Sequence, residues 1–231
     1  AKRVSSVIRR ATFTLYFCIM INGSAHTKIE QKLKRMKKNQ VVFLTDFRDL
    51  GSDTAIKMTL SRLVKENQIV RLAHGIYLIP DYDPLVGFKY PSLDNIAKAI
   101  AKRDHARILP TGTYALHKLG LSTQIPMKLV YLTDGAPRKI NIGRTTIKFK
   151  ATAPKNLSMK GEVSSLVIQA LKELGADNIT DEILMKIKSL LNNEKKELLA
   201  NDLKLAPAWI YKLLVLIIQT NPNDRTSAIK R

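Results

Sequence analysis

The sequence predicts an α+β protein in which two mixed segments are followed by a helical C-terminus. Residues 53–80 carry a helical pattern and then two short apolar runs, and residues 92–151 alternate between helical and strand patterns. From residue 162 to about 219, leucine, isoleucine and valine recur at three- and four-residue intervals. A chain of 231 residues with 45% hydrophobic residues can bury a core and suits two domains of ordinary size.

The stretch DTAIKMTLSRLVKENQIVRLAHGIYLIP, residues 53–80, predicts a helix followed directly by a hairpin. Its helical part, Thr54 to about Asn67, has one apolar face. The two runs that follow are rich in strand-forming residues, and the His74-Gly75 link suits a tight turn. The residues expected to be buried on the helix are Ile56, Leu60, Leu63 and Val64.

Two helices are expected upstream of this one. An amphipathic helix starts at about Thr27, and Thr45 caps a short helix over DFRDLG that Gly51 ends. Ser52 or Asp53 can then cap the third helix. The order of short helix, turn, longer helix and hairpin is that of a winged helix-turn-helix, here predicted over residues 28–80.

In a winged helix the second helix of the motif enters the major groove, and the wing contacts phosphates or the minor groove. The alternative for the helix alone is a plain amphipathic helix with solvated lysines. The residues predicted to contact double-stranded DNA are Ser52, Thr54, Lys57, Met58, Ser61 and Arg62 on the helix, and Arg71, His74 and Gly75 on the wing.

The charge of the chain favours a polyanionic partner. There are 39 lysine and arginine residues against 19 aspartate and glutamate residues, which gives a formal charge of +20. Nucleic acid is the first partner to consider and an anionic membrane surface the second. No apolar run reaches the ~20 residues that a membrane-spanning helix needs.

Residues 81–91 are predicted to be a linker because they contain two prolines and a glycine. Residues 92–220 then form the α+β domain with its C-terminal helices. Within it, residues 135–161 contain seven basic residues and no acidic residue. We expect a basic stripe on one face of a hairpin; its proposed residues are Arg138, Lys139, Arg144, Lys148 and Lys150.

The sequence is compatible with more than one partner for this stripe. The stripe can contact DNA phosphates beside the winged helix, or RNA. A non-catalytic module that docks an acidic protein is the other alternative. Its candidate residues are Tyr114, His117, Arg138, Lys139 and Lys148.

No combination of residues predicts an enzyme, a metal site or a cofactor. Cys18 is the only cysteine, and the four histidines lack metal-binding spacing. No phosphate-binding glycine-rich loop or nucleophile motif is present. The close carboxylate pairs, Asp46 with Asp49 and Asp81 with Asp83, suit helix-start and linker positions.

Residues 1–27 form an extension whose basic start and short apolar run, Phe13–Ile21, resemble a signal peptide. The alternatives are an extra helix or an upstream extension, with Met20 as a candidate initiator. Residues 221–231 are expected to be a tail. A single cysteine suits the reducing cytoplasm, where we place the protein.

The segment MTLSRLVKENQIVRLAHGIYLIP resembles the N-terminal winged helix of AbiEi-like antitoxins of type IV toxin-antitoxin systems. LPTGTYALHKLGLSTQIPMKLVYLTDGAPRKINIG and IKFKATAPKN are similar to the second domain of that group. The resemblance runs from about Thr27 to about Trp209. It implies a bacterial antitoxin that represses its own operon by binding promoter repeats and that counters a nucleotidyltransferase-type toxin.

Overall fold

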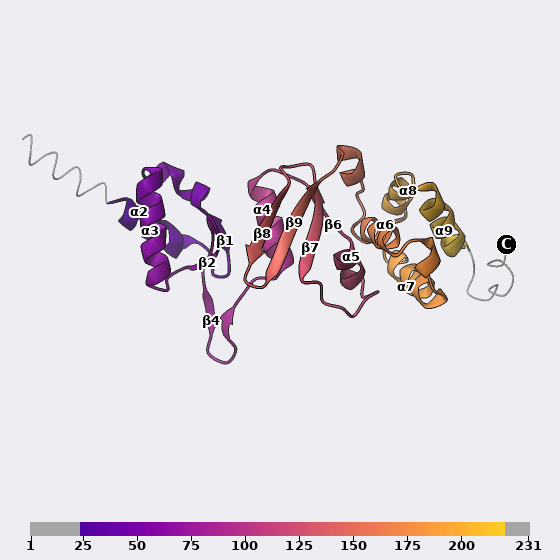
Figure 1. Cartoon of the computed structure of the whole chain (residues 1–231), viewed down its shortest axis with the longest axis horizontal. Coiled ribbons are helices and arrows are strands. Elements are labelled where there is room, and N and C mark those ends of the chain that lie inside the picture. Colours follow the sequence, from indigo (N-terminus) through magenta and orange to yellow (C-terminus); the bar gives the residue numbers. More distant parts are fainter. Residues whose placement is uncertain (1–23, 220–231) are drawn as a thin grey trace, which may run out of the picture. The chain divides into compact units, whose positions relative to one another are not determined.

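A computed structural model describes residues 24–219, which divide into two compact units at Ser92–Leu93 (Figure 1). The predicted α+β class with a helical C-terminus is confirmed. The predicted tail, residues 221–231, and residues 1–23 of the predicted extension lie outside the described residues, whereas the last residues of that extension, 25–27, belong to the first described helix.

The first unit has the element order predicted for residues 28–80, with one added strand. Its elements are α2 (Ala25–Arg35), β1 (Val41–Phe43), the 3-10 helix η1 (Leu44–Leu50), α3 (Asp53–Lys65), β2 (Val70–Ala73) and β3 (Ile76–Leu78). The three strands form an antiparallel sheet in the order β1-β3-β2. β1 was not predicted, because three residues are too few to show alternation; its pairing with β3 defines it.

The core of the first unit is built on one face of α3. Ile56, Leu60 and Leu63 are fully buried, as predicted, and each contributes about 1.5–3 kcal/mol by leaving water. Val64, the fourth predicted core residue, is only half-buried, and Thr59 is buried in its place. The buried face is therefore rotated toward Thr59, which lies one turn before Leu63.

Side chains fix the starts of η1 and α3. The Asp46 carboxylate accepts a hydrogen bond from the Phe43 backbone N–H at 2.8 Å, so Asp46 caps η1 where Thr45 was predicted to do so. Ser52 caps α3, because its Oγ accepts from the Ala55 N–H at 3.3 Å. Gly51 ends η1 as predicted.

Residues 81–91 were predicted to be a linker, but residues 81–89 of this segment form a separate two-stranded hairpin. Its strands are β4 (Asp81–Asp83) and β5 (Gly87–Lys89). The rings of Tyr82 and Phe88 meet edge to face with centroids 5.4 Å apart, and Lys89 Nζ pairs with Asp83 at 2.7 Å. These cross-strand contacts order a segment whose prolines and glycine suggest an irregular chain.

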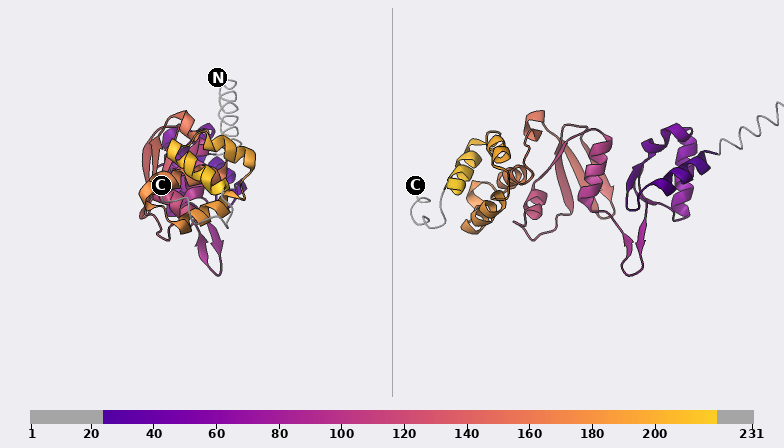
Figure 2. Two further views of the ribbon diagram at one scale, coloured as in Figure 1. Left: turned by 90° about the vertical axis from the view of Figure 1, so that its right-hand side faces the viewer. Right: turned by 180° about the vertical axis from the view of Figure 1, so that it is seen from behind.

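The second unit begins with a four-stranded sheet. Its elements are α4 (Leu93–Arg103), β6 (Ile108–Thr111), α5 (Thr113–Lys118), β7 (Lys128–Thr133), β8 (Arg138–Ile142) and β9 (Thr145–Ala151). The strand order is β6-β7-β9-β8, with β7 parallel to β9 and the other pairs antiparallel. α4 lies against one face of the sheet, in front of the strands in the rear view of Figure 2.

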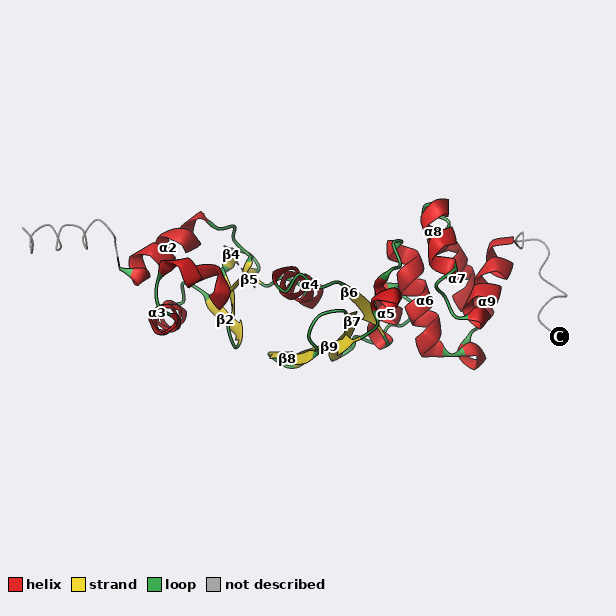
Figure 3. Cartoon of the chain, turned by 90° about the horizontal axis from the view of Figure 1, so that it is seen from above, coloured by secondary structure: helices red, strands yellow, loops and turns green. Residues whose placement is uncertain are grey.

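The C-terminal part of the second unit is helical (Figure 3). It comprises η2 (Pro154–Leu157), α6 (Glu162–Leu174), η3 (Ala176–Asn178), α7 (Asp181–Leu191), α8 (Lys196–Leu203) and α9 (Ala208–Gln219). The helices share a core with α5 that includes Ile168, Leu171, Ile187 and Leu214. α8 was not predicted, because its eight residues contain too few apolar positions to show a period.

The start of α6 is held by a buried carboxylate. Asp202, on α8, is fully buried and accepts hydrogen bonds from the Lys160 and Gly161 backbone N–H groups, both at 2.8 Å, and from Ser164 Oγ at 2.6 Å. These donors satisfy the carboxylate at the positive end of the helix dipole. Asp202 therefore ties α8 to the first turn of α6.

Candidate nucleic-acid interface

The predicted DNA-contacting residues are accessible. Eight of the nine are exposed and Gly75 is half-buried. Five of the six helix residues lie on α3 away from its buried face, as the 3.6-residue period requires, and Ser52 is the N-cap of the helix. The surface that the sequence assigns to DNA is therefore open to solvent.

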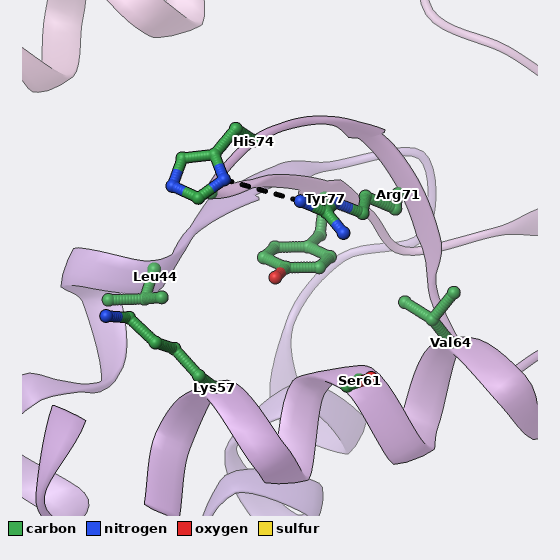
Figure 4. Close-up of a pocket in the computed structure, with 8 residues that line it drawn as sticks. Leu44, Lys57, Ser61, Val64, Arg71, His74 and Tyr77 are labelled. Atoms are coloured by element: carbon green, nitrogen blue, oxygen red, sulfur yellow. Dashed lines mark hydrogen bonds between the residues drawn. The ribbon is translucent and has the colours of Figure 1, made fainter. Parts of the chain in front are cut away.

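A hollow of about 210 Å³ lies between α3 and the turn of the β2–β3 hairpin (Figure 4). It brings together five of the nine predicted residues, which are Lys57, Ser61, Arg71, His74 and Gly75. Leu44, Val64 and Tyr77 supply its apolar wall. No carboxylate lines the hollow, so it combines hydrogen-bond donors and positive charge with these three apolar side chains.

The turn of the hairpin is fixed from two sides. Gly75 has a φ of +70°, a conformation that favours glycine, and its carbonyl accepts a hydrogen bond from the Leu44 N–H at 3.1 Å. Arg71 Nη2 lies 3.4 Å from His74 Nδ1. A guanidinium can only donate, and this contact joins the two polar side chains at the turn.

The other four predicted residues do not line the hollow. Ser52 is engaged as the cap of α3, and Thr54, Met58 and Arg62 continue the exposed face of the helix. Arg62 is five residues from Lys57, so the two side chains diverge by about 140° around the helix. Lys57 and Arg62 therefore mark the two sides of the exposed face.

The hollow includes residues that sequence reasoning did not propose. Leu44 and Tyr77 come from η1 and β3, and the helical period assigned Val64 to the core. The apolar pattern shows that these residues pack, but only the folded contacts show that they also border a surface depression.

The second unit carries an exposed basic sheet face, which we name the lysine face. It consists of Lys128 on β7, Lys139 on β8, and Lys148 and Lys150 on β9. Lys139 lies directly opposite Lys148 across the β8–β9 pair. Like charges facing each other on a sheet are destabilising, and none of the four forms an ion pair within residues 24–219.

Two residues of the predicted stripe differ from this arrangement. Arg138 lies on the opposite face of the sheet, because β8 alternates, and it pairs with Asp104 and lies over the Phe149 ring at 5.4 Å. Its assignment to the basic stripe is therefore wrong. Arg144 is exposed at the turn between β8 and β9. Lys128 belongs to the face but was not predicted, because it comes from a strand earlier in the sequence.

Three of the four carboxylates considered as metal ligands have structural partners. Asp46 caps η1, Asp49 pairs with Lys32 at 3.2 Å, and Asp83 pairs with Lys89. Across residues 24–219, no cluster of three or more histidine, cysteine, aspartate or glutamate side chains is arranged to hold a metal ion. Tyr114, a candidate for docking a protein, packs against Tyr131 with ring centroids 5.6 Å apart.

A buried tyrosine joins the sheet of the second unit to α4. Tyr131 is fully buried, and its hydroxyl donates to the Asp94 carboxylate at 2.7 Å. Burial alone would raise the pKa of Asp94, but the hydrogen bonds from Lys98 and Tyr131 and the charge of Lys118 together lower it below its usual value. Burial and the neighbouring Asp94 carboxylate raise the pKa of Tyr131.

Replacing Tyr131 with phenylalanine is expected to destabilise the protein by about 1–2 kcal/mol at neutral pH, because a hydrogen bond to a charged, partly solvated carboxylate is lost. Because folding lowers the pKa of Asp94, its ionised carboxylate stabilises the folded state at pH values above the pKa that it has in the unfolded chain. The difference between Tyr131→Phe and the natural protein should therefore shrink as pH falls below 3.8, the ordinary value for Asp94. Urea unfolding of both proteins at neutral pH and again below pH 3.8 checks this. The control is Tyr90→Phe, which removes the same hydroxyl from an exposed side chain. An equal effect of both substitutions would contradict it.

The first unit thus combines α2, η1 and α3 with a three-stranded sheet and an accessible basic surface, and the second unit has a mixed sheet with helices. Residues 28–199, more than half of the chain, match a family described as a family of unknown function (DUF6088). The chain belongs to this family. Among curated proteins, none matches the chain. In the part of the chain that the structure describes, no helix has both the length and the apolar character to cross a membrane.

Proposed function

We propose that this protein is a DNA-binding transcriptional regulator whose first unit acts as a winged helix-turn-helix. The observation that carries the proposal is the hollow between α3 and the hairpin turn, where Lys57, Ser61, Arg71 and His74 gather without a carboxylate. Positive charge and hydrogen-bond donors on the exposed face of a helix and on an adjacent hairpin match the two contact types that a duplex offers, base edges and phosphates.

The roles of the residues follow from their chemistry. A major groove about 12 Å wide admits a helix such as α3, where Lys57 and Arg62 can donate to the acceptors of guanine and Ser61 to any base. Arg71 and His74, on the hairpin, suit phosphate contacts that position the protein without reading sequence. Met58 is exposed and can pack against a thymine methyl group.

The regulator is proposed to be the antitoxin of a bacterial type IV toxin-antitoxin system that works in the cytoplasm. The resemblance of both units to AbiEi-like antitoxins supports this. The expected system has a neighbouring reading frame for a nucleotidyltransferase-type toxin and promoter repeats upstream. Co-expression of this protein should restore the growth of cells that express that toxin. Continued growth arrest would contradict the antitoxin role but would not bear on the DNA-binding proposal.

Fluorescence anisotropy of a labelled duplex tests the DNA-binding proposal directly. The duplex upstream of the protein's own reading frame should bind more tightly than a scrambled duplex of equal length and composition at the same salt concentration. Equal affinity for both duplexes would reduce the activity to general polyanion binding. Preference for single-stranded RNA of the same sequence would favour the second candidate function, a non-catalytic RNA-binding module.

The lysine face is proposed to add affinity for nucleic-acid phosphates that does not depend on sequence, because its cations lack acidic partners. Replacing Lys139, Lys148 and Lys150 with glutamine should lower the slope of log affinity against log salt by ~0.9 for each lost contact. The affinity ratio between the two duplexes should stay the same. An unchanged slope would point to an acidic protein as the partner of this face.

A further inference from the structure

The β4–β5 hairpin exposes an unusual amount of apolar surface for nine residues. Tyr82 and Phe88 on its strands and Leu85 and Val86 at its turn are all exposed, Leu85 to 95% of its full area, and Tyr90 follows just after β5. With roughly 100 Å² for each half-exposed ring, this patch reaches the 300–600 Å² size that often marks an interaction site.

The hairpin is amphipathic. Tyr82 lies opposite Phe88, so both rings are on one face, whereas Asp81, Asp83 and Lys89 alternate to the other. The Asp83–Lys89 ion pair and a hydrogen bond from the Leu85 N–H to Asp83 at 2.9 Å hold the charged face and the turn. The aromatic face is therefore presented by an ordered strand pair.

The charge of the hairpin does not favour the polyanionic partners proposed for the rest of the protein. Residues 81–89 carry two aspartates and one lysine, a net charge of −1, in a chain of net charge +20. Nucleic-acid phosphates and an anionic membrane surface would be repelled by these carboxylates. An apolar protein surface suits the aromatic face, and the same hairpin on a second copy of this chain supplies one. In such a pair the charged residues point away from the contact, because they lie on the opposite face of the hairpin.

We propose that the β4–β5 hairpin is the contact surface of a homodimer. A two-fold interface places the same patch on both subunits, so the apolar faces can cover each other. β4 and β5 pair only with each other within residues 24–219. An isolated two-stranded hairpin is only marginally stable, and packing its apolar face against that of a second copy stabilises it. Two copies would bury roughly 1,000 Å², enough for a weak dimer.

Sedimentation equilibrium of the full chain without DNA tests this proposal, so the result does not depend on the proposed DNA-binding function. The natural protein should show a monomer–dimer equilibrium. Combined Leu85→Asp and Phe88→Asp should weaken dimerisation on the order of 100-fold, because each substitution occurs twice in the interface and places charge in its centre. The conservative pair Leu85→Met and Phe88→Tyr should retain the dimer.

Ile125→Asp is the matched control, because Ile125 is 79% exposed on a loop of the second unit. It should leave the equilibrium unchanged. A chain that stays monomeric at all concentrations would overturn the proposal, as would a dimer that the aspartate pair does not weaken. In the second case the partner surface lies elsewhere, and the exposed apolar residues of α9, such as Trp209 and Tyr211, become the next to test.

Discussion

Replacing Lys57 and Arg62 with alanine is expected to weaken binding to the upstream duplex by roughly 30-fold or more, since each loses about 1 kcal/mol or more of base or phosphate contact. Both side chains are exposed and face away from the core of α3. Their removal should therefore leave the unfolding midpoint unchanged. Fluorescence anisotropy at fixed salt concentration measures the loss.

The two single substitutions and Arg71→Ala distinguish how α3 meets DNA. If the duplex contacts the whole exposed face, Lys57→Ala and Arg62→Ala both weaken binding. If it contacts only the hollow, Lys57→Ala and Arg71→Ala do so and Arg62→Ala does not, because Arg62 lies outside the hollow.

The control for lost charge is Lys196→Ala with Lys204→Ala, two exposed lysines on and just after α8. This pair removes the same charge from the second unit. Undiminished affinity of the Lys57→Ala, Arg62→Ala protein would contradict the assignment of α3 as the reading helix. Equal losses in this control would reduce the effect to general electrostatics.

Replacing Asp202 with alanine is expected to destabilise the second unit by about 3–5 kcal/mol, because it leaves buried donors of α6 unpaired. The affected groups are the Lys160 and Gly161 N–H groups and the Ser164 hydroxyl. A loss of this size lowers the melting temperature by roughly 10 °C. Differential scanning calorimetry measures the change.

Two further substitutions sharpen this test. Asp202→Asn keeps one acceptor and should recover part of the stability. Gly161→Ala should destabilise the same site by crowding it, because the added Cβ would lie 2.1 Å from Ser164 Oγ and 3.0 Å from the Asp202 carboxylate. Exposed Asp177→Ala is the control. An unchanged melting temperature for Asp202→Ala would show that α6 does not depend on this carboxylate.

Much of the candidate interface followed from local patterns. The buried positions of α3 repeat every three or four residues, and the tight turn at Gly75 was expected from the His74-Gly75 link between two apolar runs. The alternation along β8 and β9 placed Lys139, Lys148 and Lys150 on one face. These features depend on residues close together in the sequence, so periodicity and turn chemistry predict them.

Contacts between distant residues decided the rest. The hollow exists because the hairpin places Arg71 and His74 beside Lys57 of α3. Lys128 joins the lysine face through the parallel pairing of β7 with β9, and Asp202 caps a helix that begins 40 residues earlier. The sequence by itself determined the charge of each side chain and most of the buried positions of α3. The tertiary structure decided which of them meet, because strand register and helix packing depend on the whole core at once.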